Sequence, residues 1–289
     1  MRISIGDVRL FIDVEGVGWP AEETALHARP TVVLVHGGPG SNDHSHYKPA
    51  FSALADVAQL VYYDHRGNGR SDPSEPSKWN LAKWAHDLKA LCDALEIERP
   101  CVVGTSFGGF VVQAYLSAYP GHAGKAVLCS TSSRLSFERA LEVMERLGGP
   151  RARDTARRFW CGDDPSAVLD EYVEICCPLY LRAAPPPTEQ IASIAARSYR
   201  NLDLMNHFVR RGAEGHTFNL LPLLSKVTCP TLVLAGQDDP ITTIADAEEM
   251  AAALPAHLVT FEKFEHCGHP TYADAPLRTF RLIREFLTR

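Results

Sequence analysis

Short runs of apolar, often β-branched residues recur along the chain and alternate with segments in which apolar residues follow a helical spacing. Strands that are apolar on both faces are typical of buried sheets, and strands separated by helices run parallel. The pattern therefore predicts an α/β fold with a mostly parallel central sheet and helices on both faces. The expected strands are residues 31–36, 58–64, 100–105, 125–130, 230–236 and 257–264.

The amino-terminal residues 1–15 alternate apolar and polar side chains around Gly6-Asp7, which predicts a β-hairpin. This pattern differs from the long apolar core of a secretory signal, so none is expected. No run reaches the 18 or so apolar residues that a membrane span requires, and we expect no membrane association.

Charge and cysteine usage narrow the class of partner and the compartment. The formal net charge of -6 is spread along the 289 residues without a basic block, so we expect no nucleic-acid partner and favour a small-molecule substrate. The eight cysteines form no Cys-x-x-Cys pair, and several lie in apolar runs. They are typical of reduced thiols in a cytoplasmic protein.

The alternation of strands and helices stops between Arg134 and Lys226, where only helical patterns remain. A segment of this length is too long for a loop. We expect a core domain formed by residues 1–133 and 227–289, with residues 134–226 inserted as a helical cap. Within the cap, Pro185-Pro186-Pro187 is expected to end one helix and stiffen the connection to the next.

A Gly-x-Ser-x-Gly motif, Gly104-Thr105-Ser106-Phe107-Gly108, lies between the expected strand 100–105 and a helical pattern over residues 107–119. A serine on a strand-to-helix turn stands exposed on a strained backbone, and the glycines remove side chains that would collide with it. Negative charge that develops on a substrate oxygen is favoured at the helix amino terminus. We predict that Ser106 is a nucleophile.

A nucleophile that attacks a carbonyl needs donors for the oxyanion. The backbone N–H of Phe107, directly after the serine, is one expected donor. The second is expected from His36-Gly37-Gly38-Pro39-Gly40, which follows the strand 31–36, and we choose Gly38. A phosphate-binding loop is the alternative, but the Gly-Lys-Ser/Thr and Gly-x-Gly-x-x-Gly patterns are absent.

In enzymes with this serine turn, an acid and then a histidine follow the nucleophile along the chain. Asp238 and Asp239 follow the strand 230–236, at the strand end where ligands of parallel sheets gather. The spacing Gly-x-x-Asp favours Asp239, with Asp238 as the alternative that caps the turn. His266 and His269 lie between the last expected strand and a final helix over 275–287, and Gly268-His269 favours His269.

These motifs together resemble the α/β-hydrolase fold superfamily and, more narrowly, the proline iminopeptidase-like hydrolases. The resemblance rests on His36-Gly37-Gly38-Pro39-Gly40, residues 64–71, the serine motif, Gly236-Gln237-Asp238-Asp239 and Cys267-Gly268-His269, which are spread over most of the core. It implies a catalytic triad of Ser106, Asp239 and His269 and cleavage of amino-terminal residues, amides or esters.

Two features depart from the aminopeptidases of that family, which hold the substrate's amino group with carboxylates. Some of them have Glu directly after the catalytic Asp, where this chain has Pro240. Glu214, late in the cap, is a candidate substrate-binding residue, although an ordinary solvated glutamate is the competing interpretation.

The leading hypothesis is a serine hydrolase that cleaves an ester or amide bond of a small molecule through an acyl-enzyme intermediate, without a cofactor. A lactonase, a carbon–carbon hydrolase or a lyase could use the same triad. A ligand-binding receptor built on a hydrolase scaffold is the non-enzyme alternative. The oligomeric state is not predicted.

Two further clusters have structural interpretations. Asp64 and Arg66, in the segment 64–71, are expected to fix a loop beneath the site through hydrogen bonds. Asp43, His44 and His46 are residue types that bind metals, but further ligands at zinc-like spacing are missing, so no metal site is expected.

Overall fold

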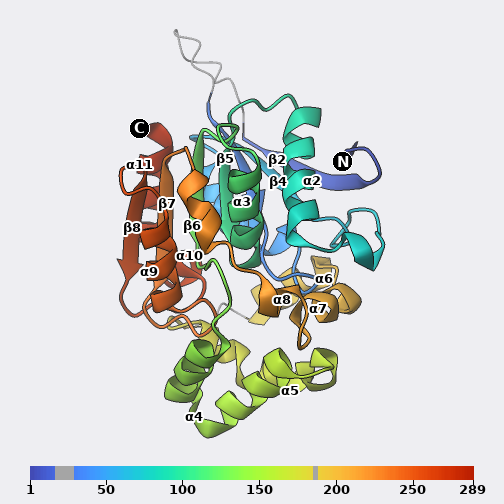
Figure 1. Ribbon diagram of the computed structural model, residues 1–289, viewed down its shortest axis with the longest axis vertical. Helices are drawn as coiled ribbons and strands as arrows, with labels where there is room; N and C mark the ends of the chain where they lie inside the picture. Colours follow the sequence, from blue (N-terminus) through green and yellow to red (C-terminus); the bar gives the residue numbers. More distant parts are fainter. Residues whose placement is uncertain (17–28, 185–187) are drawn as a thin grey trace.

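The computed structural model describes residues 1–16, 29–184 and 188–289, and an eight-stranded sheet lies at its centre (Figure 1). The strand order is β1-β2-β4-β3-β5-β6-β7-β8, and all neighbours from β4 to β8 are parallel. The prediction of an α/β fold with a mostly parallel sheet is therefore confirmed. The strands are β1 (Arg2–Ser4), β2 (Arg9–Glu15), β3 (Thr31–Val35), β4 (Gln59–Tyr63), β5 (Cys101–Thr105), β6 (Lys125–Cys129), β7 (Thr231–Gly236) and β8 (Val259–Phe264).

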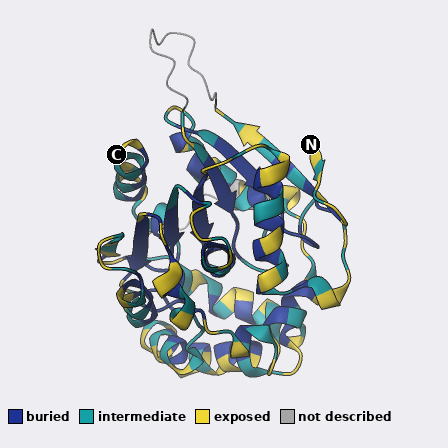
Figure 2. Ribbon diagram, turned by 45° about the horizontal axis from the view of Figure 1, so that its top comes forward, coloured by how far each residue is buried: buried dark blue, intermediate teal, exposed yellow. Residues whose placement is uncertain are grey.

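The central strands are buried on both faces, as their continuous apolar sequences predict (Figure 2). Every residue of β5 and β7 is buried, whereas β8 at the sheet edge buries only its last residue, Phe264. Each of the six predicted strands ends within two residues of its expected bounds.

The amino-terminal hairpin is also present. β1 pairs antiparallel with β2, with Ile3 opposite Leu10, and Gly6 takes a left-handed φ of 94° near the turn. β2 then pairs antiparallel with β4, so the hairpin extends the parallel sheet at one edge.

Helices cover both faces of the sheet, and each face has its own apolar core. One core contains Trp84 of α2, Val111 of α3 and Met250 of α9; the other contains Phe51 of α1 and Ile283 of α11. These core helices are α1 (Lys48–Phe51), α2 (Leu81–Ala94), α3 (Phe107–Ala118), α9 (Ile244–Ala253), α10 (Thr271–Asp274) and α11 (Pro276–Thr288). Short 3-10 helices are η1 (His44–His46), η2 (Ser52–Leu54), η3 (Pro76–Lys78), η4 (Pro165–Val168), η5 (Cys177–Tyr180) and η6 (Leu221–Lys226).

Between β6 and β7 the described residues form helices and no strand. Figure 1 shows α4 and α5 as a separate layer beyond one end of the sheet. Leu141, Met144 and Trp160 of α4 pack with Tyr172 of α5 in a third apolar core. The helices are α4 (Phe137–Cys161), α5 (Leu169–Ile175), α6 (Thr188–Arg197), α7 (Leu202–Val209) and α8 (Glu214–Thr217).

The helix α4 contains a kink, because Gly149 has the non-helical angles φ 77° and ψ -175° and Pro150 follows it. The expected helix stop at Pro185-Pro186-Pro187 lies outside the described residues. We call residues 134–226 the cap segment below; its bounds as a separate domain stay a prediction.

All eight cysteines are free thiols, in line with the expectation from their spacing. Within the described ranges, no helix combines the length and apolar character needed to cross a bilayer.

Candidate active site

Ser106 lies on the turn between β5 and α3 and has φ 52° and ψ -122°, a strained backbone for a residue with a side chain. Three hydrogen bonds hold this turn. The Ser106 N–H donates to the carbonyl of Cys129 at 3.0 Å, and its carbonyl accepts from Gly109 N at 2.9 Å and Thr131 Oγ1 at 2.8 Å. The neighbouring strand β6 therefore fixes the position of the serine.

The glycines around Ser106 are required by close packing. A Cβ atom on Gly104 would lie 2.6 Å from the carbonyl oxygen of Gly108, and one on Gly108 would overlap the carbonyl oxygen of Val35. A Cβ on Gly109 would overlap the side chain of Thr131. The motif thus lets α3 start directly against β3 and β5.

Two backbone N–H groups of residues that line a cavity with Ser106 lack a hydrogen-bond acceptor among the described residues. In the glycine-rich loop, Gly37 N donates to Tyr47 Oη at 3.0 Å and Gly40 N donates to Asn68 Oδ1 at 2.7 Å. Within the described residues, the N–H groups of Gly38 and Phe107 have no acceptor. Gly38 takes a left-handed φ of 60°, and both residues line a cavity with Ser106.

Asp239 and His269 form a buried pair, with His269 Nδ1 lying 2.8 Å from Asp239 Oδ2. Asp239 follows β7, and its carboxylate also accepts hydrogen bonds from Ile241 N at 2.8 Å, Thr242 N at 3.0 Å and Thr242 Oγ1 at 2.8 Å. With His269, four donors therefore fix the orientation of the carboxylate.

The two alternative residues lie elsewhere. Asp238 Oδ1 is 2.8 Å from Arg146 Nη1 of the cap segment, and His266 is exposed with a φ of 55°. The structure thus brings together Asp239 and His269, the aspartate and the histidine chosen from chain order.

The loop that carries His269 is held by residues that sequence reasoning did not identify. His269 N donates to the carbonyl of Tyr180 at 2.8 Å, and Gly268 N donates to Asp274 Oδ2 at 2.7 Å. Asp274 also accepts from Arg182 N and Ala183 N, so the cap segment is tied to this loop. These contacts join residues about 90 positions apart, and no local pattern signals them.

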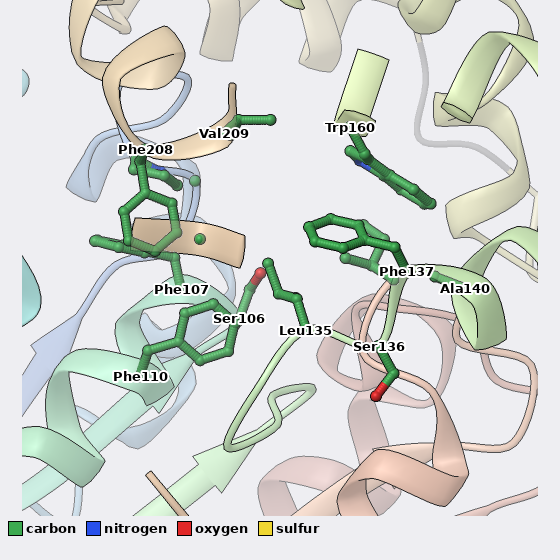
Figure 3. A pocket seen from close by; sticks show the side chains of 14 residues that line it. Ser106, Phe107, Phe110, Leu135, Ser136, Phe137, Ala140, Trp160, Phe208 and Val209 are labelled. Atoms are coloured by element: carbon green, nitrogen blue, oxygen red, sulfur yellow. The ribbon is translucent and has the colours of Figure 1, made fainter. Parts of the chain in front are cut away.

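Two cavities meet at Ser106. The first, which we call the apolar cavity, includes among its lining Phe107, Phe110, Phe137, Trp160, Phe208 and Val209 (Figure 3). The second, the polar cavity, contains His269 and also Ser41, Asn42, Tyr47, Ser130, Tyr180 and Tyr272. Gly38, Ser106 and Ile241 line both. No hydrogen bond among the described residues joins Ser106 Oγ to His269, although both face the polar cavity.

Glu214 does not line either cavity. Its carboxylate accepts hydrogen bonds from Leu81 N, at 3.0 and 3.2 Å, at the amino terminus of α2. Burial raises the pKa of this carboxyl above its usual value, and the Leu81 hydrogen bond opposes that shift. The structure thus gives Glu214 a helix-capping contact and does not bring it together with Ser106.

Asp64 and Arg66 make the hydrogen bonds that were expected beneath the site. Arg66 is fully buried and forms paired hydrogen bonds with Asp87, at 2.8 Å each, and with Asp7, at 2.8 and 3.1 Å. Asp64 accepts from His44 N at 2.9 Å, His44 Nδ1 at 2.7 Å and Arg70 N at 2.8 Å. Burial would raise the pKa of Asp64, but the hydrogen bond from His44, the neighbouring His36 and His44 imidazoles and the Arg70 N–H hold it below its usual value.

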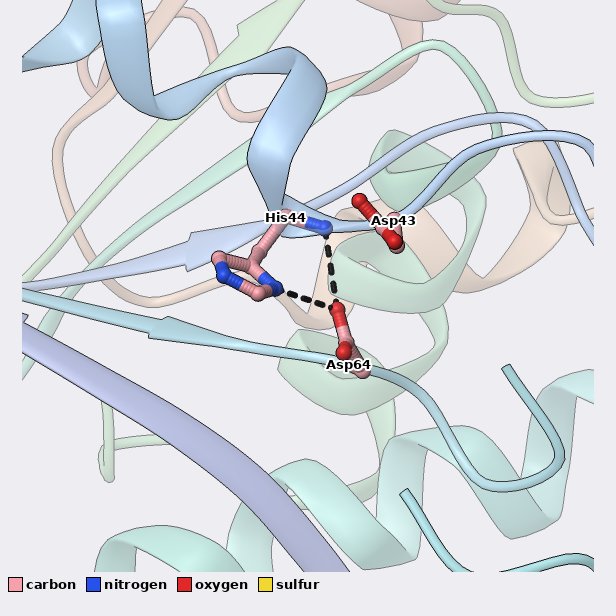
Figure 4. A group of neighbouring side chains, drawn as sticks. All are labelled: Asp43, His44 and Asp64. Atoms are coloured by element: carbon pink, nitrogen blue, oxygen red, sulfur yellow. Dashed lines mark hydrogen bonds and ion pairs between the residues drawn. The ribbon is translucent and has the colours of Figure 1, made fainter. Parts of the chain in front are cut away.

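Asp43, His44 and Asp64 form a compact group of metal-ligand types (Figure 4). Their oxygens already accept hydrogen bonds from protein donors, because Asp43 binds Ser45 N at 2.9 Å and Tyr199 N at 2.8 Å in addition to the Asp64 contacts. The third predicted residue of this type, His46, contacts Ser198 Oγ at 3.0 Å instead. The group acts as a hydrogen-bonded support for the loop.

Comparison with known proteins supports the fold. A family model described as the alpha/beta hydrolase fold matches residues 30–159, and one described as TAP-like protein matches residues 207–288. A proline iminopeptidase of Heyndrickxia coagulans is 25% identical over 292 residues, covering 96% of this chain and 97% of the relative. A 2-hydroxy-6-oxononadienedioate/2-hydroxy-6-oxononatrienedioate hydrolase of Paraburkholderia xenovorans (strain LB400) is 25% identical over 299 residues, covering 99% and 94%.

A solved structure shares the whole fold. The crystal structure of a proline iminopeptidase from Mycobacterium smegmatis matches with a TM-score of 0.75 at 21% identity, covering 100% of this chain and 97% of that chain. The family model, the named relatives and the solved structure together show that the chain has the α/β-hydrolase fold and is similar to the proline iminopeptidases.

Proposed function

We propose that this α/β-hydrolase is a serine hydrolase that cleaves an ester or amide bond of a small molecule through an acyl-enzyme intermediate. The observation that carries the proposal is the meeting of three features at one point. Ser106 stands on a strained turn, His269 shares its cavity and is paired with buried Asp239, and two unpaired N–H groups lie beside the serine.

Each group has one role in this mechanism. Ser106 Oγ attacks the carbonyl carbon while His269 Nε2 takes its proton, and the Asp239 carboxylate orients the ring and stabilises the imidazolium. The N–H groups of Gly38 and Phe107 bind the oxyanion. His269 then gives the proton to the leaving group, and water, activated by the same histidine, releases the acid.

We propose that the cap segment, residues 134–226, is a lid domain that forms part of the substrate pocket. Its contacts with the core support this role. Trp160 and Phe208 contribute to the apolar cavity, and Arg146 and Arg139 form ion pairs at 2.8 Å with Asp238 and Asp246 of the core.

The free thiols favour a reducing compartment, and we propose the cytoplasm. The spread of negative charge along the chain is in line with a small-molecule substrate rather than a nucleic acid.

A substrate panel tests the mechanism. We expect wild type to hydrolyse short-chain aryl esters and to be labelled by a fluorophosphonate probe, and Ser106→Ala to lose about 10⁴- to 10⁶-fold in kcat/KM and all labelling. Circular dichroism and urea unfolding should show an unchanged fold, because Ser106 Oγ makes no hydrogen bond among the described residues. Activity that survives in the alanine variant would end the proposal, and a folded wild type that neither turns over nor takes the probe would favour a receptor.

A further inference from the structure

We infer that the substrate is a neutral ester with an aromatic or similarly bulky apolar acyl group and a small hydroxylated leaving group. The inference rests on the proposed function, because it uses the roles of Ser106 and His269. It goes further by assigning each half of the substrate to one of the two cavities.

The ester carbonyl has only one place to bind. Ser106 and Gly38 line both cavities, so a carbon attacked by Ser106 Oγ lies at their boundary. With its oxygen held by the N–H groups of Gly38 and Phe107, the two substituents of that carbon must extend into different cavities.

His269 decides which substituent enters which cavity. This histidine lines the polar cavity and is not among the residues of the apolar one. A general acid must lie within hydrogen-bond reach of the atom that it protonates. The leaving oxygen is therefore on the polar side, and the acyl chain extends into the apolar cavity.

The apolar cavity fits a ring. Figure 3 shows Phe107, Phe110 and Phe208 on one side of the Ser106 hydroxyl and Phe137 and Trp160 on the other. Aromatic walls contact an aromatic ring through edge-to-face and offset packing. The lining of this cavity is mostly apolar, which matches the chemical character of a phenylpropionyl group.

The polar cavity offers neutral hydrogen-bonding groups to the leaving group. Tyr47, Tyr180 and Tyr272 line it, and burial raises the pKa of each phenol above its usual value. Ser130, at the end of β6, lines it with a left-handed φ of 50°, a strain that occurs at functional sites. A leaving group with a hydroxyl matches this lining.

Charge is missing from both walls. Among the described residues that line the two cavities there is no Asp, Glu, Lys or Arg. The nearby carboxylates of Asp238 and Glu214 are already bound to Arg146 and Leu81 N. A protonated amine on the acyl group would lose its hydration without an ion pair in return, so an aminoacyl ester should be a poor substrate.

The reaction on such a substrate is balanced. Ser106 Oγ forms a bond to the acyl carbon, the bond from that carbon to the leaving oxygen breaks, and His269 transfers the serine proton to that oxygen. Water then adds to the acyl carbon and returns a proton to Ser106, so one ester and one water give one acid and one alcohol.

Two constitutional isomers test the orientation with purified full-length protein. 2-Hydroxyethyl 3-phenylpropionate carries the ring on the acyl side, and 3-phenylpropyl glycolate carries it on the alcohol side. After division by each ester's hydroxide-catalysed rate constant, we expect kcat/KM to favour the first by about 10- to 100-fold, the value of burying a ring. A preference for the glycolate, or equal rates, would overturn the assignment.

A second pair of substrates tests whether the apolar cavity excludes a charged amino group. The 2-hydroxyethyl ester of phenylalanine differs from 2-hydroxyethyl 3-phenylpropionate only by its amino group, and we expect about a 10-fold or larger preference for the phenylpropionate at pH 7. Leu135 lines the apolar cavity beside Ser106, so Leu135→Asp places a carboxylate there, and Leu135→Asn is the matched neutral control. We expect the aspartate variant alone to raise the ratio of amino to deaminated ester activity, by about 10-fold.

The outcomes separate the two proposals. Hydrolysis of aryl acetate and probe labelling at Ser106, together with no preference in either pair, would overturn the substrate assignment and leave the serine mechanism in place. If the folded wild type hydrolyses none of the esters and is not labelled by the probe, the serine mechanism is overturned, and the substrate assignment with it.

Discussion

Two buried Asp–His pairs of nearly the same geometry are found among the residues that the structure describes. His269 Nδ1 is 2.8 Å from Asp239, and His44 Nδ1 is 2.7 Å from Asp64. Both aspartates are almost fully buried, and both follow a strand of the parallel sheet, β7 and β4. A search for hydrogen-bonded acid and histidine alone would return both.

The surroundings of the two pairs differ. His269 shares a cavity with Ser106 and Gly38, and Phe107 lines the adjoining cavity that also contains Ser106 and Gly38. His44 packs against the ring of Phe11, with centroids 5.1 Å apart, and its partner Asp64 also binds Arg70 N. A buried Asp–His pair therefore indicates only a rigid imidazole, and its use depends on what the second ring nitrogen faces.

The largest effect is expected from a substitution that breaks the Asp239–His269 pair. Asp239→Asn keeps the size of the side chain but removes the charge that orients His269, and we expect kcat/KM to fall about 10⁴-fold. Asp238→Asn is the matched control, since it removes only a partly exposed ion pair with Arg146 and should change kcat/KM less than about 3-fold. Steady-state kinetics on an aryl ester measures both, and equal losses in the two variants would remove Asp239 from the mechanism.

The same substitution in the second pair should affect stability instead. The Asp64 carboxylate accepts from three donors, His44 N, His44 Nδ1 and Arg70 N. In Asp64→Asn, at least one of these buried donors would face the NH₂ group of the amide instead of an oxygen. We expect the free energy of unfolding to fall by about 3 kcal/mol in urea titrations. The activity of the protein that remains folded should stay within about 10-fold of wild type. A 10⁴-fold loss of kcat with unchanged stability would show that the second pair is catalytic and end the distinction.

The sequence was sufficient to predict the sheet and the serine turn, because both depend on local features. Strands buried on both faces have continuous apolar sequences, and the close approach of α3 to β3 and β5 requires Gly104 and Gly108. The choice of Asp239 and His269 followed from chain order and turn residues. Their pairing at 2.8 Å agrees with that choice.

The cavity walls could not be predicted in the same way. Trp160 and Phe208 are 54 and 102 positions beyond Ser106, and a helical pattern marks such residues only as buried, not as lining a pocket. Glu214 shows the same limit: its residue type suggested a substrate anchor, whereas its carboxylate caps α2. Placement of the cap segment depends on long-range packing that no local spacing records.

The smallest expected effect concerns the histidines around the second pair. Burial lowers the pKa of the His36 and His65 imidazoles, and the pKa of His65 lies well below its usual value. Burial also lowers the pKa of His46, to about 4. In the unfolded chain these groups take up protons below pH 6.5 or so, while the folded protein does not. Stability should therefore fall as the pH drops from about 6.5 towards 4, by at most about 1.4 kcal/mol per pH unit for each histidine.

His46 can be used to test this pH dependence of stability without changing the proposed catalytic residues. Among the described residues, its ring forms a hydrogen bond only with Ser198 Oγ. His46→Gln should reduce the slope of unfolding free energy against pH, between pH 6 and 4.5, by about 1 kcal/mol per unit relative to wild type. Activity on an aryl ester at pH 7 should not change. Carboxylates titrate in both proteins, so the difference between the two slopes isolates the histidine, and an unchanged slope would assign the acid sensitivity to groups outside this loop.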